Sequence, residues 1–63
     1  MNRAAQLARM RVAGYHDDRR TFTRLLVESR VSKPAALFAF AEGERLRSAG
    51  VRCGCVECRE AAS

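Results

Sequence analysis

Apolar residues recur at helical spacing in the first stretch of the chain. Leu7 and Met10 lie three residues apart among alanines, arginines and a glutamine, which are good or acceptable helix formers. Gly14 follows, and glycine is common just beyond the end of a helix. The pattern predicts a helix over residues 2–13 that ends at Gly14.

The second stretch carries a stronger apolar face. Phe22 is followed three and four residues later by leucines, and these offsets share one face of a helix. Asp17 or Asp18 can accept hydrogen bonds from backbone amides of the first turn. These residues predict a helix over 17–30 whose apolar face joins the core.

Pro34 and Gly50 bound the third stretch. Proline suits a first turn because its missing amide donor has no partner there, and glycine suits the left-handed residue after a helix. The sequence between them predicts a helix over 34–49. Together the three helices predict an all-α fold class, with one compact three-helix domain over residues 1–63.

The start of the third helix is apolar on every side, since residues 35–41 read AALFAFA. A helix without a polar face must be covered all round. Either the other two helices cover it completely, or Phe38 and Phe40 contact a second copy in a homodimer or a partner protein.

The chain is small for a stable fold. It has 63 residues, 48% of them hydrophobic and 30% charged, which is a globular composition. A domain of this size buries only about 60% of the surface of its unfolded chain. Folds this small often gain stability from a disulfide, a metal or a partner.

All three cysteines fall within six residues, as Cys53, Cys55 and Cys58. This CxCxxC spacing lets a tight turn, which Gly54 eases, place three thiolates around one ion at about 2.3 Å. A disulfide here would close a very short loop and leave one thiol over. We expect residues 51–59 to bind structural Zn2+, with free or redox-active thiols and an iron–sulfur cluster as alternatives.

A structural zinc site takes four ligands. His16 is the only histidine, and it falls at the predicted turn between the first two helices, where a docked C-terminal segment could reach it. We expect His16 to be the fourth ligand, so that the bound metal contributes folding free energy. Alternative fourth ligands are Asp17, Asp18, Glu57 or a cysteine of a second subunit. If one of these binds the ion, His16 is an exposed turn residue.

The chain is basic. Twelve Lys and Arg against seven Asp and Glu give a net charge of +5, and seven of the cations precede residue 31. A positive field suits phosphate groups, an acidic protein surface or solubility. Part of it has a local explanation, because Arg20 and Arg24 can pair with Asp17 and Glu28 along a helix. The candidates for an anion-binding surface are Arg3, Arg9, Arg11, Arg19 and Arg20.

Other features exclude several classes of protein. A helix that reads DNA presents polar side chains to base edges, whereas the third helix presents alanine, leucine and phenylalanine. The lone Tyr15 could stack on a base or close the end of a small core. We expect no enzyme, because no supported Ser, His and Asp set is present and a four-ligand zinc site leaves no position for water.

Membrane insertion is also excluded by pattern. No apolar run approaches the roughly 20 residues that span a bilayer, and arginines interrupt the N-terminal segment. We therefore expect a cytoplasmic protein without a membrane partner.

Two segments carry a resemblance to a known group. Residues 24–31 (RLLVESRV), followed by the alanine-rich helix and by residues 49–59 (AGVRCGCVECR), resemble small accessory proteins encoded by bacteriophages of actinobacteria. The resemblance covers residues 20–59. The chain departs from the group in one respect, because it has Phe38 and Phe40 where a tryptophan-bearing helix is expected. It implies a protein that acts in the cytoplasm of an infected host cell by binding a host component.

Two functions remain open at this point. The first is a zinc-stabilised protein-binding module that contacts a host protein through the apolar start of the third helix or through the arginines. The second is a nucleic-acid-associated or ribosome-associated factor that places Arg9, Arg11, Arg19 and Arg20 on phosphates.

Overall fold

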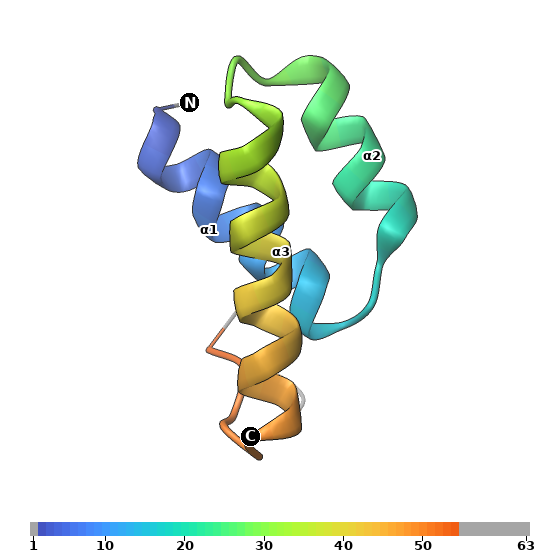
Figure 1. The fold of residues 1–63 in the computed structure, drawn as a ribbon, viewed down its shortest axis with the longest axis vertical. Helices are drawn as coiled ribbons and strands as arrows, with labels where there is room; N and C mark the ends of the chain where they lie inside the picture. Colours follow the sequence, from blue (N-terminus) through green and yellow to red (C-terminus); the bar gives the residue numbers. More distant parts are fainter. Residues whose placement is uncertain (1, 55–63) are drawn as a thin grey trace.

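The computed structural model describes residues 2–54, and this part of the chain folds into three helices without a strand. They are α1 (Arg3–Tyr15), α2 (Arg19–Glu28) and α3 (Lys33–Ser48), shown in Figure 1. The predicted all-α, three-helix fold is confirmed. The predicted zinc-binding turn over residues 51–59 lies mostly outside the described residues.

Each helix begins at a residue that suits its first turn. The Asn2 side chain accepts a hydrogen bond of 2.8 Å from the amide of Ala5. Asp18 begins α2 in the same way, because its carboxylate accepts from both the amide and the hydroxyl of Thr21, at 3.1 and 2.6 Å. Ser32 precedes α3 and Pro34 lies in the first turn, where no amide partner is needed.

The end of α1 corrects the sequence-based expectation. The helix continues through Gly14 to Tyr15, and the left-handed residue that ends it is Asp17, with φ of 54°. The amides of Asp17 and Asp18 bond to the carbonyls of Gly14 and Ala13, at 3.1 and 2.8 Å. This pair of bonds is the Schellman motif, and aspartate is one of the few side chains that tolerate its left-handed position.

The end of α3 repeats the motif with the residue that the sequence predicted. Gly50 has φ of 77°, its amide bonds to the carbonyl of Arg47, and the amide of Val51 bonds to the carbonyl of Leu46 at 3.0 Å. The chain therefore reverses at Gly50 and returns alongside α3 (Figure 1, orange). Glu28 ends α2 two residues before the predicted end, because Ser29 is already extended.

The most extensive helix pair is α1 with α3, and two glycines allow it. A Cβ atom on Gly14 would lie 2.0 Å from the carbonyl oxygen of Phe40. A Cβ atom on Gly43 would lie 2.0 Å from the carbonyl oxygen of Arg11. No side chain fits at either distance, so the backbones of α1 and α3 touch directly where they cross.

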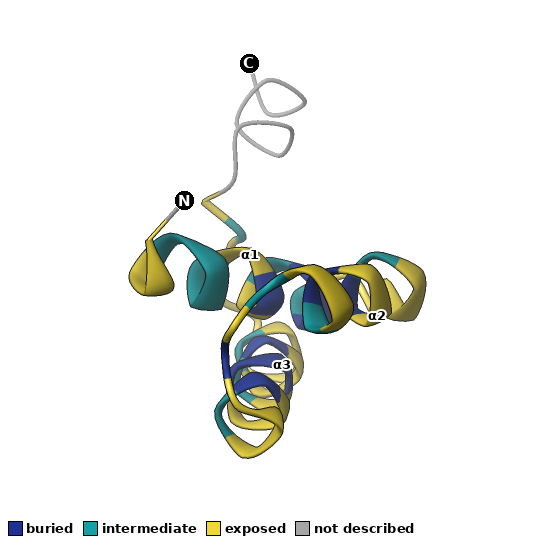
Figure 2. Cartoon of the chain, turned by 90° about the horizontal axis from the view of Figure 1, so that it is seen from above, coloured by how far each residue is buried: buried dark blue, intermediate teal, exposed yellow. Residues whose placement is uncertain are grey.

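The core lies where the three helices face one another, as the dark blue residues in Figure 2 show. The α2 helix enters it through Phe22 and Leu25, and the ring of Phe22 lies 4.5 Å from that of Phe40, centroid to centroid. The buried core residues are Met10, Ala13, Phe22, Leu25, Val31, Ala36, Ala39 and Phe40. Contacts between α2 and α3 are fewer than those of either other pair, so α1 connects the bundle.

Replacing Gly43 by alanine should destabilise the fold. In an open helix this change stabilises by about 1 kcal/mol, since alanine has the higher helix propensity. Here the added methyl group forces two backbones apart, and we expect a net loss of about 1–3 kcal/mol, the usual cost of overpacking. Urea unfolding followed by circular dichroism measures it, with Glu44→Ala on the exposed side of α3 as the control. A variant more stable than the wild type would contradict the close crossing.

The cap of α2 should make stability depend on pH. The hydrogen bond from the Thr21 hydroxyl, followed by that from its amide, lowers the pKa of Asp18 from its ordinary value of 3.8. Because the folded-state pKa is the lower one, the stabilisation is complete above pH 3.8 and disappears as the pH falls through the folded-state value.

The matched variants are Asp18→Asn, which keeps a capping oxygen, and Asp18→Ala, which removes it. Between pH 5 and pH 2, we expect the melting temperature of Asp18→Asn to fall less than that of the wild type. Above pH 4, we expect Asp18→Ala to be less stable than the wild type. Equal acid sensitivity of the wild type and Asp18→Asn would contradict a role for the ionised carboxylate.

Candidate functional site

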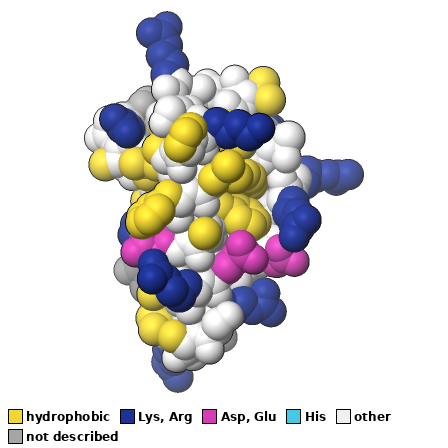
Figure 3. Space-filling view, in the orientation of Figure 1, with side chains coloured by type: hydrophobic (Ala, Val, Ile, Leu, Met, Phe, Trp, Pro, Cys, Tyr) yellow, Lys and Arg dark blue, Asp and Glu magenta, His cyan; other side chains and the backbone are white. Residues whose placement is uncertain are grey.

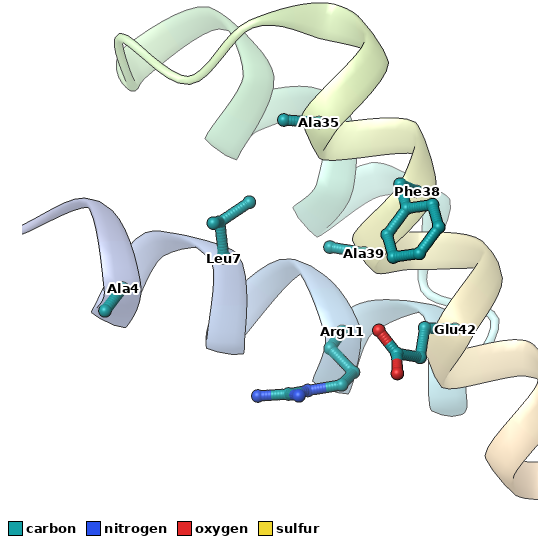
Figure 4. Close-up of a pocket in the computed structure, with 7 residues that line it drawn as sticks. All are labelled: Ala4, Leu7, Arg11, Ala35, Phe38, Ala39 and Glu42. Carbon is teal, nitrogen blue, oxygen red and sulfur yellow. The ribbon is translucent and has the colours of Figure 1, made fainter.

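A groove separates the N-terminal parts of α1 and α3, with a volume of about 420 Å³. Figure 4 shows that the two helices diverge and leave the groove open between them. Small and apolar side chains form most of its walls. On α1 these residues follow helical spacing, and so do those on α3. The lining residues are Ala4, Leu7, Arg11, Ala35, Phe38, Ala39 and Glu42.

The two phenylalanines predicted to bind a partner lie in different environments. Phe38 is 67% exposed at the edge of the groove, and its neighbour Leu37 is 48% exposed. Phe40 is buried against Phe22 and belongs to the core, which corrects its proposed surface role. Within the described chain α3 is therefore not covered all round, and Phe38 is the aromatic residue available to a partner.

The charges of the groove are balanced. Arg11 comes from α1 and Glu42 from α3, and Figure 4 shows both side chains at the end of the groove nearest the helix crossing. The rest of the lining is uncharged. The net charge of the chain therefore does not extend into this surface.

The predicted anion-binding arginines are all exposed, but they are spread out. Arg19 pairs with Asp17 at 3.5 Å, so part of its charge is compensated. Arg11 lies in the groove. On the face drawn in Figure 3 the cationic side chains surround an apolar centre and do not gather in one patch. Arg9 and Arg20 lie on the exposed surface of α1 and α2.

The second candidate site lies at the junction of α1 with the segment after α3. The hydroxyl of Tyr15 donates a hydrogen bond of 2.5 Å to the carbonyl of Val51. The guanidinium of Arg47 donates to the carbonyl of Tyr15 at 3.4 Å. The ring of Tyr15 meets that of His16 edge to face, with centroids 5.2 Å apart. The segment that leads to the cysteines is thus bonded to the residue beside the histidine.

Cys53 follows this junction and is half buried. Two residues span at most about 7 Å, so its Cα atom lies within that distance of the Cα atom of Val51. Cys55 and Cys58 lie outside the described residues. Residues 2–54 contain no group of three metal-binding side chains, and the predicted zinc site therefore remains a prediction.

Two functional features were not predicted from the sequence. Gly43 is an isolated glycine inside a helical pattern, and such a glycine often has a packing role. The role of Tyr15 in holding Val51 depends on a contact across 36 residues, for which the sequence carries no local signal.

No family model, curated protein or solved structure matches the chain. The resemblance to phage accessory proteins therefore stays a prediction. Among the described residues, no helix has the length and apolar character needed to cross a membrane.

Proposed function

We propose that the protein is a small basic protein-binding module that binds its partner in the groove between α1 and α3. The observation that carries this proposal is Phe38, a large apolar side chain that is 67% exposed beside a hollow of about 420 Å³. Full burial of a phenylalanine side chain contributes about 1.5–3 kcal/mol, so a partner that covers it gains affinity there.

The lining of the groove favours a protein segment over a nucleic acid. Leu7, Ala35 and Ala39 offer apolar contact, and Glu42 offsets the positive charge of Arg11 that would attract phosphates. Partners that bind between helices in this way present apolar side chains at helical spacing. A segment with one apolar side chain for the hollow and opposite charges for Arg11 and Glu42 fits the groove best. The resemblance to phage accessory proteins supports a host-cell protein as the partner.

Replacing Phe38 by alanine should weaken partner binding without unfolding the protein, because the side chain is mostly exposed. The matched control is Val27→Ala on α2, an apolar residue that is 80% exposed and outside the groove. We expect a protein that copurifies with tagged wild type and Val27→Ala to be lost with Phe38→Ala, and the purified pair to bind at least tenfold more weakly. Equal binding by all three would contradict the groove as the interface.

The competing function, binding to nucleic acid or the ribosome, rests on the exposure of Arg9, Arg11, Arg19 and Arg20. It makes a different prediction about salt. Affinity for duplex DNA falls linearly with the logarithm of salt concentration, with a slope of about −0.9 for each neutralised phosphate. Copurification of RNA with Phe38→Ala, together with such a slope, would favour this second function.

We propose further that Cys53, Cys55, Cys58 and His16 hold a structural Zn2+ ion. Three thiols and an imidazole form a ligand set that zinc prefers. The contact of Tyr15 with Val51 supports His16, because it brings the start of the cysteine segment to the neighbouring residue. Asp17 and Asp18 are less suited, since Arg19 and Thr21 already engage their carboxylates. When bound, the ion would crosslink the turn between α1 and α2 to the segment after α3 and add stability.

Native mass spectrometry of the freshly purified, reduced protein should show one zinc ion per chain, removed by chelator with a fall in melting temperature. Cys53→Ser should lose the ion at moderate chelator concentration, and His16→Ala should bind it more weakly because one ligand is replaced by water. Asp17→Gly serves as the control, because it removes the carboxylate and tolerates the left-handed conformation of this position, and it should bind zinc like the wild type. A metal-free wild type would contradict the proposed site, and unchanged binding by His16→Ala would remove His16 from it.

A further inference from the structure

Tyr15 makes three contacts at one place in the fold. It is the last residue of α1, its hydroxyl donates to Val51, and its carbonyl accepts from Arg47 in the last turn of α3. Its ring packs edge to face against His16. The two hydrogen bonds join residues that are 36 and 32 positions apart in sequence. Tyr15 thus links the end of α1 to the last turn of α3 and to the segment that follows it.

We infer that Tyr15 is the positioning residue of the metal site: it holds Val51, two residues before Cys53, next to the neighbour of His16 and so sets the affinity for zinc. This inference rests on the proposed zinc site. Tyr15 is not itself a ligand, because its hydroxyl is engaged by Val51.

The hydrogen bonds at Val51 show how the segment is held. The amide of Val51 bonds to the carbonyl of Leu46 at 3.0 Å as part of the helix end. Its carbonyl accepts from Tyr15 at 2.5 Å. Both polar groups of the Val51 backbone are therefore fixed, one to α3 and one to α1. Only Arg52 separates this fixed residue from Cys53.

The same contact orients the histidine side of the site. The ring of His16 lies at 71° to that of Tyr15, and this packing restricts the directions in which the imidazole nitrogens point. Ligands held near their bound positions lose less conformational freedom when the ion binds. Groups that orient metal ligands typically change metal affinity by about 10–100-fold when removed.

The hydroxyl can be removed with little effect on the helices. The hydrogen bond is exposed, and in Tyr15→Phe the ring stays against His16 while water replaces the hydroxyl at the Val51 carbonyl. Thr23→Val is a matched control, since it removes another exposed hydroxyl that donates to a backbone carbonyl, that of Arg19 at 2.8 Å. Thr23 lies on α2, outside these contacts.

The test measures zinc affinity of the reduced full chain by competition with a chromophoric chelator, using Zn2+ alone as the ligand. We expect Tyr15→Phe to bind zinc about tenfold more weakly than the wild type, the lower end of the range for orienting groups. Thr23→Val should bind like the wild type. The melting temperatures of the metal-free wild type and Tyr15→Phe should agree within a few degrees.

A double-mutant cycle with His16→Ala separates positioning from a general loss of stability. If Tyr15 brings the cysteine segment and His16 together, Tyr15→Phe should weaken zinc binding much less when His16 is already absent. Arg47→Met, which removes the donor to the Tyr15 carbonyl, provides a second variant should Tyr15→Phe fail to fold, and it should also weaken zinc binding.

The outcomes distinguish this inference from the proposed site. Equal zinc affinity of the wild type and Tyr15→Phe, with the ion bound to both, would overturn the inference and leave the zinc site standing. The same tenfold loss in the His16→Ala background would overturn it as well. A wild type that binds no zinc would overturn the proposed site and this inference together.

Discussion

The direct contact between the backbones of α1 and α3 at Gly14 and Gly43 is the constraint on which the rest of the structure depends. Because neither residue carries a side chain, the helices meet at a distance that any Cβ atom would prevent. They diverge from this crossing toward their N-terminal ends, which opens the groove beside Phe38. On the other side of the crossing Tyr15 comes within reach of Arg47 and Val51. One close approach therefore positions both the groove and the Tyr15 junction.

The helices could be predicted because their signals are local. Apolar spacing, the Asp18 cap, Pro34 and the left-handed Gly50 each act within a few residues, and the structure contains all of them. The role of Gly14 could not be predicted in this way, since a glycine that ends a helix and one that admits a neighbouring helix look alike in sequence. The true left-handed residue, Asp17, carries a side chain that rarely adopts that conformation.

The candidate surfaces show the same limit. Phe38 and Phe40 are two positions apart, which is about 200° around a helix, so one must face away from whatever the other contacts. Because the start of α3 is apolar on every side, it has no polar face to indicate which phenylalanine is buried and which is exposed. The packing of Phe22 decides it, by taking Phe40 into the core. Likewise, the cysteine spacing predicts a metal ligand set by itself, whereas the link from Tyr15 to Val51 exists only after α1 and α3 have packed.

The thin attachment of α2 has a consequence for how the molecule moves. This helix reaches the core chiefly through Phe22 and Leu25, and it has few contacts with α3, whereas α1 and α3 form the most extensive helix pair. We therefore expect local opening to begin with α2, while α1 and α3 stay packed against each other. The groove is lined by α1 and α3, and the Tyr15 junction joins α1 to the segment after α3, so opening of α2 would leave the elements that form both in place.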